Sequence, residues 1–216
     1  MENSQQQIRP DGPESRRLAA ELIKAGGIVA YRTDTFYGLG TDPFNVDALR
    51  ALNELKGRDG KPILLLIADE SDAKRLLLDG GSELFRALAA RFWPGPLTLV
   101  ARAGANLPDL LTAGTGTVGV RFPDDEAARE IVRVCGGALT ATSANPSGRP
   151  PARNAFEVAD YFKDTLCLVL DGGEARTLHP STVLDVSGTT PRLIREGVVS
   201  RAELEEALGR IGLPLE

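Results

Sequence analysis

The chain has 216 residues, 42% of them hydrophobic, and a formal net charge of −5. This length favours one large domain with a sizeable core, and the acidic balance argues against a general nucleic-acid binder while leaving room for a local basic patch. No apolar run approaches the ~20 residues of a membrane span. The first 13 residues lack the apolar core of an export signal, so we expect no membrane association.

The two cysteines, Cys135 and Cys167, each lie within an apolar run. That placement favours core thiols over a disulfide or a redox pair. We therefore expect a reducing, cytoplasmic setting.

The first half of the chain predicts alternating helices and strands after a mobile arm at residues 1–13. Apolar residues at helical spacing predict a helix over 14–24, and a buried strand follows at 27–31. Asn45 caps a helix that ends at the Lys-Gly-Arg segment 56–58. The continuous apolar run 62–68 predicts a strand of a sheet that is covered on both faces.

The second half continues this alternation and then clusters its strands. Helices are predicted near 71–78, 82–92, 124–134, 154–163 and 200–209, and strands near 97–102, 118–122, 138–141, 166–170, 182–186 and 192–194. The pattern predicts a single α/β domain at 14–210, with a twisted mixed β-sheet flanked by helices, and a C-terminal tail at 211–216.

Four short polar segments follow the ends of apolar elements and have the composition of an anion site. They are 33–38 (TDTFYG), 56–58 (KGR), 142–145 (TSAN) and 181–185 (STVLD). Guanidinium and ammonium groups match phosphate oxygens, and hydroxyls complete such a shell. A turn explains any one segment alone, and a helix C-terminus also favours basic residues. Together the segments predict a phosphate-bearing ligand.

Two other patterns are weaker. The glycine-rich segment 114–119 has the spacing of a dinucleotide loop, but it precedes a strand instead of opening a helix. His179 is the only histidine and precedes Pro180, which favours a loop residue over a catalytic base or zinc ligand.

Arg121 lies inside an apolar strand, so its guanidinium requires an anion from either the protein or a ligand.

Seven segments in a fixed order, from about residue 14 to about 210, resemble the YrdC/Sua5 family. They are 33–40 (TDTFYGLG), 56–58 (KGR), 93–98 (WPGPLT), 120–121 (VR), 143–148 (SANPSG), 181–183 (STV) and 195–197 (REG). The order of seven motifs over nearly the whole chain is far more specific than any single motif.

This resemblance implies a concave α/β sheet with a positively lined cavity and the activity of a threonylcarbamoyl-AMP synthase. L-threonine, bicarbonate or CO₂, and ATP would give threonylcarbamoyl-AMP and pyrophosphate. A separate tRNA threonylcarbamoyltransferase would use the product to make N6-threonylcarbamoyladenosine. Mg²⁺ is expected on the ATP phosphates, held mostly by ATP and water, and no dedicated protein metal site is expected.

The resemblance also implies roles for individual residues. Lys56, Arg58, Ser143 and Asn145 are assigned to catalysis. ATP binding is assigned to the same four residues with Thr117, Arg149 and Arg195, and threonine binding to Thr33, Arg121 and Ser181. The reaction needs no covalent protein nucleophile, because positioning and electrostatic stabilisation suit phosphoryl chemistry.

The chain departs from the usual family pattern at Arg32, where proline is usual, at Phe36, where valine is usual, and at Asp59, where proline is usual. Two readings of other classes remain beside the synthase. One is a non-catalytic protein of the same fold that binds tRNA or double-stranded RNA. The other is a carbamoyl-transfer domain of the hydrogenase-maturation type.

Overall fold

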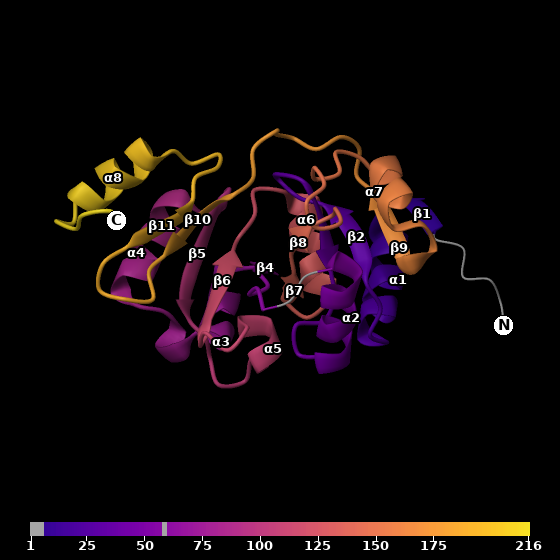
Figure 1. The fold of residues 1–216 in the computed structure, drawn as a ribbon, viewed down its shortest axis with the longest axis horizontal. Coiled ribbons are helices and arrows are strands. Elements are labelled where there is room, and N and C mark those ends of the chain that lie inside the picture. Colours follow the sequence, from indigo (N-terminus) through magenta and orange to yellow (C-terminus); the bar gives the residue numbers. More distant parts are fainter. Residues whose placement is uncertain (1–6, 58–59) are drawn as a thin grey trace.

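Two mixed β-sheets lie side by side and are flanked by helices (Figure 1). The computed structural model describes residues 7–57 and 60–216. The five-stranded sheet has the order β1 (Gln7–Pro10), β9 (Leu168–Asp171), β2 (Val29–Arg32), β3 (Tyr37–Gly40) and β8 (Thr142–Ser143). The six-stranded sheet has the order β11 (Arg192–Arg195), β10 (Thr182–Asp185), β5 (Leu97–Arg102), β6 (Thr117–Arg121), β4 (Leu65–Ile67) and β7 (Ala138–Thr140).

Each sheet contains both parallel and antiparallel pairs. In the first sheet β9 runs parallel to β1 and β2, whereas β3 is antiparallel to β2 and β8. In the second, β10 is parallel to β5 and β4 is parallel to β6, and the other pairs are antiparallel. The predicted mixed α/β class is confirmed, but two sheets replace the single sheet that we expected.

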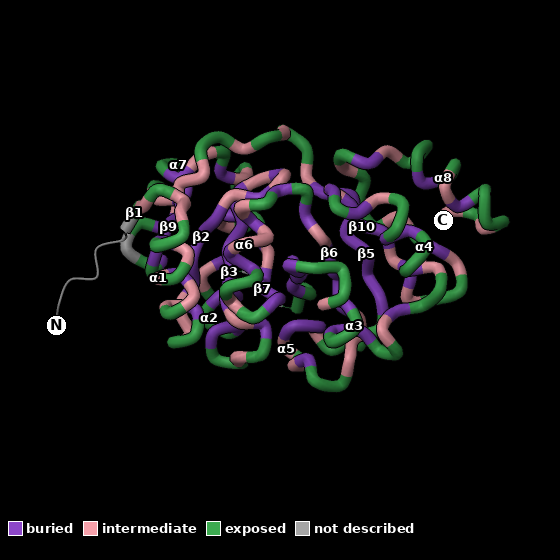
Figure 2. The backbone as a smooth tube through the Cα atoms, turned by 180° about the vertical axis from the view of Figure 1, so that it is seen from behind, coloured by how far each residue is buried: buried purple, intermediate pink, exposed green. Residues whose placement is uncertain are grey.

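The helices pack around these sheets and expose their outer faces, whereas the strands are mostly buried (Figure 2). They are α1 (Pro13–Lys24), α2 (Val46–Lys56), α3 (Ala73–Leu76), α4 (Glu83–Phe92), α5 (Asp109–Thr112), α6 (Glu126–Val134), α7 (Ala155–Phe162) and α8 (Arg201–Gly209). Three 3₁₀ turns are η1 (Glu70–Asp72), η2 (Leu78–Gly80) and η3 (Lys163–Thr165).

Helix α2 has the ends that its sequence indicates. The Asn45 side chain accepts from the backbone N–H groups of Asp47 and Ala48, both over 3.1 Å. Gly57 follows the helix with φ 57° and ψ 44°, a left-handed conformation that glycine adopts without strain. Lys56 is therefore the last residue of the helix.

Two predicted elements are shorter than expected. The strand predicted at 62–68 reduces to β4, because Ile63 donates its N–H to Leu111 outside the sheet. The helix predicted at 71–78 splits into η1, α3 and η2. Leu77 forms a β-bridge with Ala103 at this point, and Asp79 adopts a positive φ of 55°.

Both chain ends of the predicted domain hold more structure than expected. Residues 7–10 form β1, which pairs with β9, so the arm predicted over 1–13 is wrong for this part; residues 1–6 lie outside the described residues. In the predicted tail, the Glu216 backbone pairs with Pro191 and Leu193. Leu213 and Leu215 pack against the main core.

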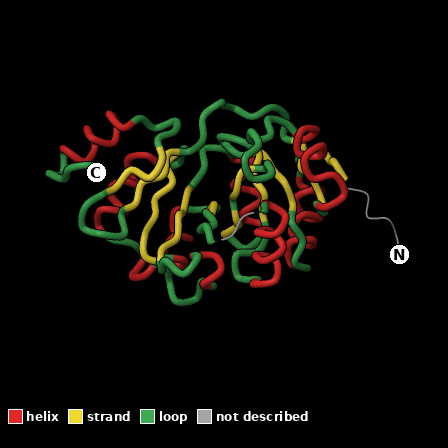
Figure 3. Tube along the Cα trace, viewed as in Figure 1, coloured by secondary structure: helices red, strands yellow, loops and turns green. Residues whose placement is uncertain are grey.

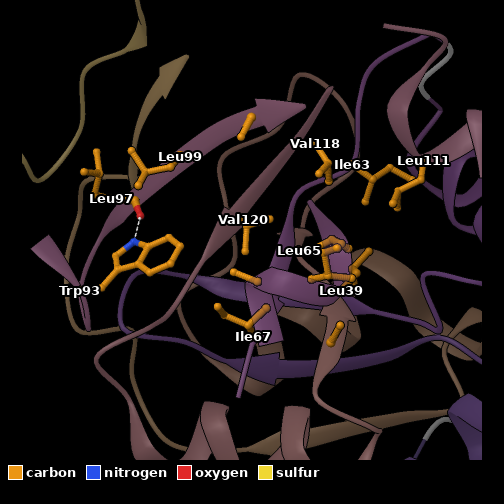
Figure 4. Packing of buried hydrophobic residues seen from close by; sticks show 14 of the residues in the cluster. Leu39, Ile63, Leu65, Ile67, Trp93, Leu97, Leu99, Leu111, Val118 and Val120 are labelled. Carbon is orange, nitrogen blue, oxygen red and sulfur yellow. Dashed lines mark hydrogen bonds between the residues drawn. The ribbon is translucent and has the colours of Figure 1, made fainter. Parts of the chain in front are cut away.

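The main core runs through both sheets and their helices and is filled mostly by aliphatic side chains, among them Leu39 of β3 and Val120 of β6 (Figure 4). Trp93 closes one end of it. Its indole N–H donates to the carbonyl of Leu97 over 2.7 Å, and its ring meets Phe85 edge to face. This pairing satisfies the buried indole N–H while the ring covers apolar neighbours.

One long loop connects the two sheets across the top of the molecule (Figure 3). This loop, residues 172–181, leaves β9 in the five-stranded sheet and enters β10 in the six-stranded sheet. We call it the strap. Its first part is tied down, because the Tyr37 hydroxyl donates to Gly173 over 2.7 Å and Arg176 Nε lies 3.5 Å from Asp125.

Candidate anion-binding site

A cavity of about 1110 Å³ opens between the two sheets. The five-stranded sheet contributes the turn 33–36, β3 and β8, and the six-stranded sheet contributes β4, β5, β6, β10 and β11. Leu178 and Pro180 of the strap also line it. Because residues from both sheets meet here, a ligand in this cavity contacts segments that are far apart in the sequence.

The strands give the cavity a polar face through their two-residue repeat. Thr117, Gly119 and Arg121 of β6 face the cavity, whereas Val118 and Val120 belong to the core. Strands β5 and β10 follow the same rule: Thr98 and Asp185 line the cavity, as does Ser181 just before β10, and Leu99 and Leu184 pack in the core. The expected projection of Arg121 away from Val120 is therefore confirmed.

Gly119 keeps the cavity floor open. A Cβ at this position would come within 2.4 Å of Leu64 Cδ2 and 3.2 Å of Thr98 Cγ2. Any side chain here would push into its neighbours or fill the cavity, so this glycine preserves the space between Thr117 and Arg121.

The charged residues of the described lining are mostly basic. Lys61, Arg121, Arg192 and Arg195 line the cavity with one acidic residue, Asp185, whose carboxylate lies 3.4 Å from Arg192 Nη2. A surplus of positive charge in a partly enclosed space attracts anionic ligands.

Arg121 forms an ion pair with Asp34. Arg121 Nη1 donates to Asp34 Oδ1 over 2.6 Å, and the side chains are only 7% and 6% exposed. The sequence left open whether this arginine pairs with the protein or with a ligand. The structure shows that this guanidinium pairs with a protein carboxylate and also lines the cavity.

Arg195 lies over Ser181 at the neighbouring part of the wall. Its Nη2 donates to the Ser181 carbonyl over 2.9 Å, and the Ser181 hydroxyl lies 3.1 Å from that of Thr98. Partial burial, and then the positive charge of Arg121, lower the pKa of Arg195. The two positive guanidinium groups repel each other, and an anion bound between them would relieve this repulsion.

Thr33 organises the turn that faces these arginines. Its hydroxyl donates to the Phe36 carbonyl over 2.8 Å and accepts from the backbone N–H of Thr35 over 3.1 Å. The Thr35 hydroxyl lies 3.1 Å from that of Thr33, and both threonines line the cavity. The segment is a tight polar turn whose hydroxyl groups are held in place before a ligand arrives.

Lys56 reaches from the end of α2 to the segment that follows β8. Its ammonium donates to the carbonyls of Ser143 and Asn145, the latter over 2.5 Å, and lies 3.4 Å from Asn145 Oδ1. The Asn145 amide donates to the Arg149 carbonyl over 2.6 Å. Lys56 and Asn145 thus shape the backbone that presents Ser143 to the cavity.

The structure brings most of the predicted site residues together. Those that line the cavity are Thr33, Thr117, Arg121, Ser143, Ser181 and Arg195. Lys56 and Asn145 are buried behind Ser143. Arg149 is exposed and its guanidinium lies 5.7 Å from the centre of the Tyr161 ring. Arg58 lies outside the described residues.

Several lining residues had no role in the sequence-based assignment: Thr35, Lys61, Thr98, Asp185 and Arg192. Thr35 and Asp185 fall within the polar segments that were recognised. Thr98 is a single hydroxyl in an otherwise apolar strand, and the two-residue repeat places it on the face of Val100. That repeat was the available signal. Arg192 carries no comparable local signal.

His179 and the two cysteines, which were assigned no catalytic role from the sequence, lie away from the cavity lining or at its edge. His179 is an exposed strap residue whose N–H donates to the Thr177 hydroxyl. Both cysteines are free, and Cys167 is exposed, so the expected core position is wrong for it. Over the described ranges, no group of three histidine, cysteine or carboxylate side chains is arranged to hold a metal ion. None of the helices described has both the length and the apolar character to cross a bilayer.

The fold and cavity define a twin-sheet α/β protein with a candidate anion-binding site between the sheets. The chain belongs to the Sua5/YciO/YrdC family, because the model of that family, described as telomere recombination, matches residues 21–197.

Relatives of known name support this membership. A threonylcarbamoyl-AMP synthase from Pyrococcus abyssi is 37% identical over 196 residues, which cover 90% of this chain and 57% of the relative. A threonylcarbamoyl-AMP synthase from Thiobacillus denitrificans is 40% identical over 173 residues, covering 80% of this chain and 90% of the relative.

The solved structure of P. abyssi Sua5 complexed with L-threonine has a TM-score of 0.89 and 34% sequence identity to this chain. The match covers 97% of this chain and 61% of that structure. The chain therefore spans about three fifths of the P. abyssi protein, and the two share one fold over nearly all of this chain.

Proposed function

We propose that this protein is a threonylcarbamoyl-AMP synthase. It would convert L-threonine, CO₂ or bicarbonate, and ATP into threonylcarbamoyl-AMP and pyrophosphate. The observation that carries the proposal is the pair of cavity arginines, Arg121 and Arg195, which face the hydroxyl-bearing turn 33–36 across the two sheets. Synthase relatives and a threonine-bound structural neighbour add support.

The chemistry matches this cavity because it is a reaction among anions. The threonine amine adds to CO₂ and loses a proton, which gives a carbamate. A carbamate oxygen then attacks the α-phosphorus of ATP in line, and the bond to pyrophosphate breaks. The protein supplies position and positive charge, which lower the barrier without a covalent intermediate.

The threonine half of the site is assigned to Arg121, Thr33 and Ser181. Arg121 would hold the threonine carboxylate with the donors that Asp34 leaves available, since a guanidinium suits planar, bidentate recognition of a carboxylate. Thr33 and Ser181 would contact the rest of the amino acid. The amine then points away from the carboxylate, free to take up CO₂.

The nucleotide half is assigned to residues on the other side of the same wall. Ser143, Thr117 and Arg195 line the cavity and would contact ATP directly. Lys56 and Asn145 would act there through the segment that presents Ser143. Arg58 is proposed to meet the triphosphate, and Arg149 would join the nucleotide site from its exposed position.

Magnesium would enter this reaction as part of the Mg·ATP substrate, with ATP and water as most of its ligands.

We further propose that a separate tRNA threonylcarbamoyltransferase uses the product. We also propose a cytoplasmic setting, which the two free thiols support. The hypothesis of a non-catalytic protein that binds tRNA or double-stranded RNA predicts no turnover of ATP.

The deciding experiment is a reaction of purified protein with ATP, Mg²⁺, L-threonine and bicarbonate, followed by mass spectrometry and a pyrophosphate assay. We expect threonylcarbamoyl-AMP and an equal amount of pyrophosphate, both dependent on threonine and bicarbonate. Pyrophosphate release without the mixed anhydride would contradict the proposal, as would the absence of both products.

A further inference from the structure

The ion pair between Asp34 and Arg121 connects the two sheets at the cavity wall. Asp34 belongs to the turn between β2 and β3 of the five-stranded sheet, and Arg121 ends β6 of the six-stranded sheet. The contact spans 2.6 Å between two nearly buried side chains. It therefore sets how far the hydroxyl-bearing turn stands from the guanidinium.

Asp34 is itself held on both sides. Its Oδ1 accepts from Arg121, and its Oδ2 accepts from the backbone N–H of Asp124 over 3.2 Å. The neighbours Thr33 and Thr35 line the cavity, whereas Asp34 lies behind them. A carboxylate with both oxygens engaged restrains the orientation of the guanidinium it binds.

Arg121 keeps donors for a ligand. Asp34 accepts from Nη1, and no residue that the structure describes accepts from Nε or Nη2. Since Arg121 lines the cavity, these N–H groups are the ones that an incoming carboxylate meets. Their direction is set by the carboxylate behind them.

We propose that Asp34 is a positioning residue of the threonine site. It holds Arg121 at a fixed angle and distance from the turn 33–36, so that the guanidinium receives the substrate carboxylate while Thr33 of that turn meets another part of the amino acid. This inference rests on the proposed function. It differs from simple charge neutralisation, in which Asp34 would compete with the substrate for Arg121.

The two roles predict opposite effects of substitution. In Asp34→Asn, the amide satisfies either Arg121 or the Asp124 N–H but not both, and the negative charge is lost. In Asp34→Glu, the charge stays but moves by one methylene group. Positioning predicts that both variants bind threonine about tenfold or more weakly. Neutralisation predicts that Asp34→Asn binds more tightly and that Asp34→Glu resembles the unchanged protein.

The test is calorimetric titration of the full chain with L-threonine, and separately with ATP. Thermal unfolding of each variant checks that it is folded. Asp11→Asn is the matched control, because Asp11 pairs with Arg16 over the same 2.6 Å and does not line the cavity. We expect weaker threonine binding with unchanged ATP binding in both Asp34 variants, and no change in the control.

A double variant separates action through Arg121 from a general defect. Asp34→Asn combined with Arg121→Ala should bind threonine no more weakly than Arg121→Ala alone. Additive losses, unchanged threonine affinity in folded Asp34→Asn, or tighter binding would each overturn the positioning role. Absence of threonine binding by the unchanged protein would instead overturn the proposed function, and this inference with it.

Discussion

Lys56 shows how a single buried charge shapes the proposed nucleotide side of the cavity. Its ammonium bonds to two backbone carbonyls of the segment that contains Ser143 and Asn145, which lies 87 or more positions later in the chain. An ammonium in this position satisfies buried acceptors and also contributes positive charge near the proposed phosphate site. Its loss should therefore change both the stability of the protein and its activity.

We predict that Lys56→Met lowers pyrophosphate release roughly 10- to 150-fold, the equivalent of ~1.5–3 kcal/mol for contacts to a charged donor. The variant should also unfold at a lower denaturant concentration, because the carbonyls of Ser143 and Asn145 lose the Lys56 ammonium as their hydrogen-bond donor. Arg58→Ala should lower activity over the same range. Arg50→Ala on the exposed face of α2 is the control, and near-normal activity of Lys56→Met or Arg58→Ala would remove that residue from the mechanism.

Loss of the Arg121 side chain should weaken the apparent affinity for threonine more than that for ATP. In Arg121→Ala we expect the Michaelis constant for threonine to rise while that for ATP changes little, because the guanidinium is proposed to hold the threonine carboxylate. Initial rates of pyrophosphate release at varied threonine and at varied ATP measure both constants. If only the constant for ATP rises, Arg121 belongs to the nucleotide half. Serine should be a poor but detectable substrate, because one methyl group discriminates by only ~1–3 kcal/mol.

At the scale of elements, Tyr37 of β3 hydrogen-bonds to the strap, and its hydroxyl should make the stability of the protein depend on pH. The Tyr37 side chain is buried, and its hydroxyl donates to Gly173 and accepts from the Gly172 N–H over 3.1 Å. Burial raises the pKa of Tyr37 to about 12. The unfolded chain releases this proton near pH ~10, so between pH ~10 and ~12 it binds fewer protons than the folded protein.

Stability should therefore be fully retained below pH ~10 and should fall as the pH rises towards 12. Tyr37→Phe is expected to be less stable at neutral pH, because it lacks the strap contacts, and to lose less further stability in the alkaline range. Urea unfolding at several pH values measures this slope, with Tyr161→Phe as the control. A slope in Tyr37→Phe equal to that of the unchanged protein would contradict the prediction. Some slope remains from Tyr31, whose pKa burial also raises.

Elements with local end signals were predictable from the sequence. Asn45 and Gly57 bound α2 as expected, and the helix predicted over 200–209 begins after Ser200, whose side chain accepts from the Glu203 N–H. Strand β3 was missed because two of its four residues are glycine, which weakens the strand pattern, and β8 because it is two residues long and pairs with β3 from a remote part of the chain. Local patterns carry no record of such partners.

The candidate site follows the same division. The polar segments were recognisable because hydroxyl and basic residues follow apolar elements, and the resemblance placed them in one cavity. The division into two sheets, the ion pair of Asp34 with Arg121, and the contacts of Lys56 with Ser143 all depend on packing between distant segments. Residue types alone do not define which of two arginines meets a protein carboxylate.

At the scale of the whole molecule, the strap closes one side of the cavity. Its ends are tied by Tyr37 and by the pairing of Val198 with Pro180, whereas Leu178 is 68% exposed and lines the cavity mouth. A segment whose residues are mostly exposed or half-buried opens more readily than the buried sheets it joins.

We predict that Mg·ATP with L-threonine slows amide hydrogen exchange at residues 177–179, because a ligand below Leu178 gives this part of the strap new contacts. Exchange measured by mass spectrometry, with and without the ligands, tests this. The amides of α8 serve as the internal control. Equal strap exchange in both states, under conditions where binding is demonstrated, would contradict the prediction.

The two-residue repeat of β5, β6 and β10 gives the molecule two sets of positions that can change separately. Substitutions at Thr98, Thr117 or Asp185 alter what the cavity accepts, while Leu99, Val120 and Leu184 on the opposite face continue to hold the sheet together. A scan of all substitutions along these strands should therefore alternate, with lost activity at one position and lost folding at the next. Such a scaffold can acquire new substrates by point changes without a new core.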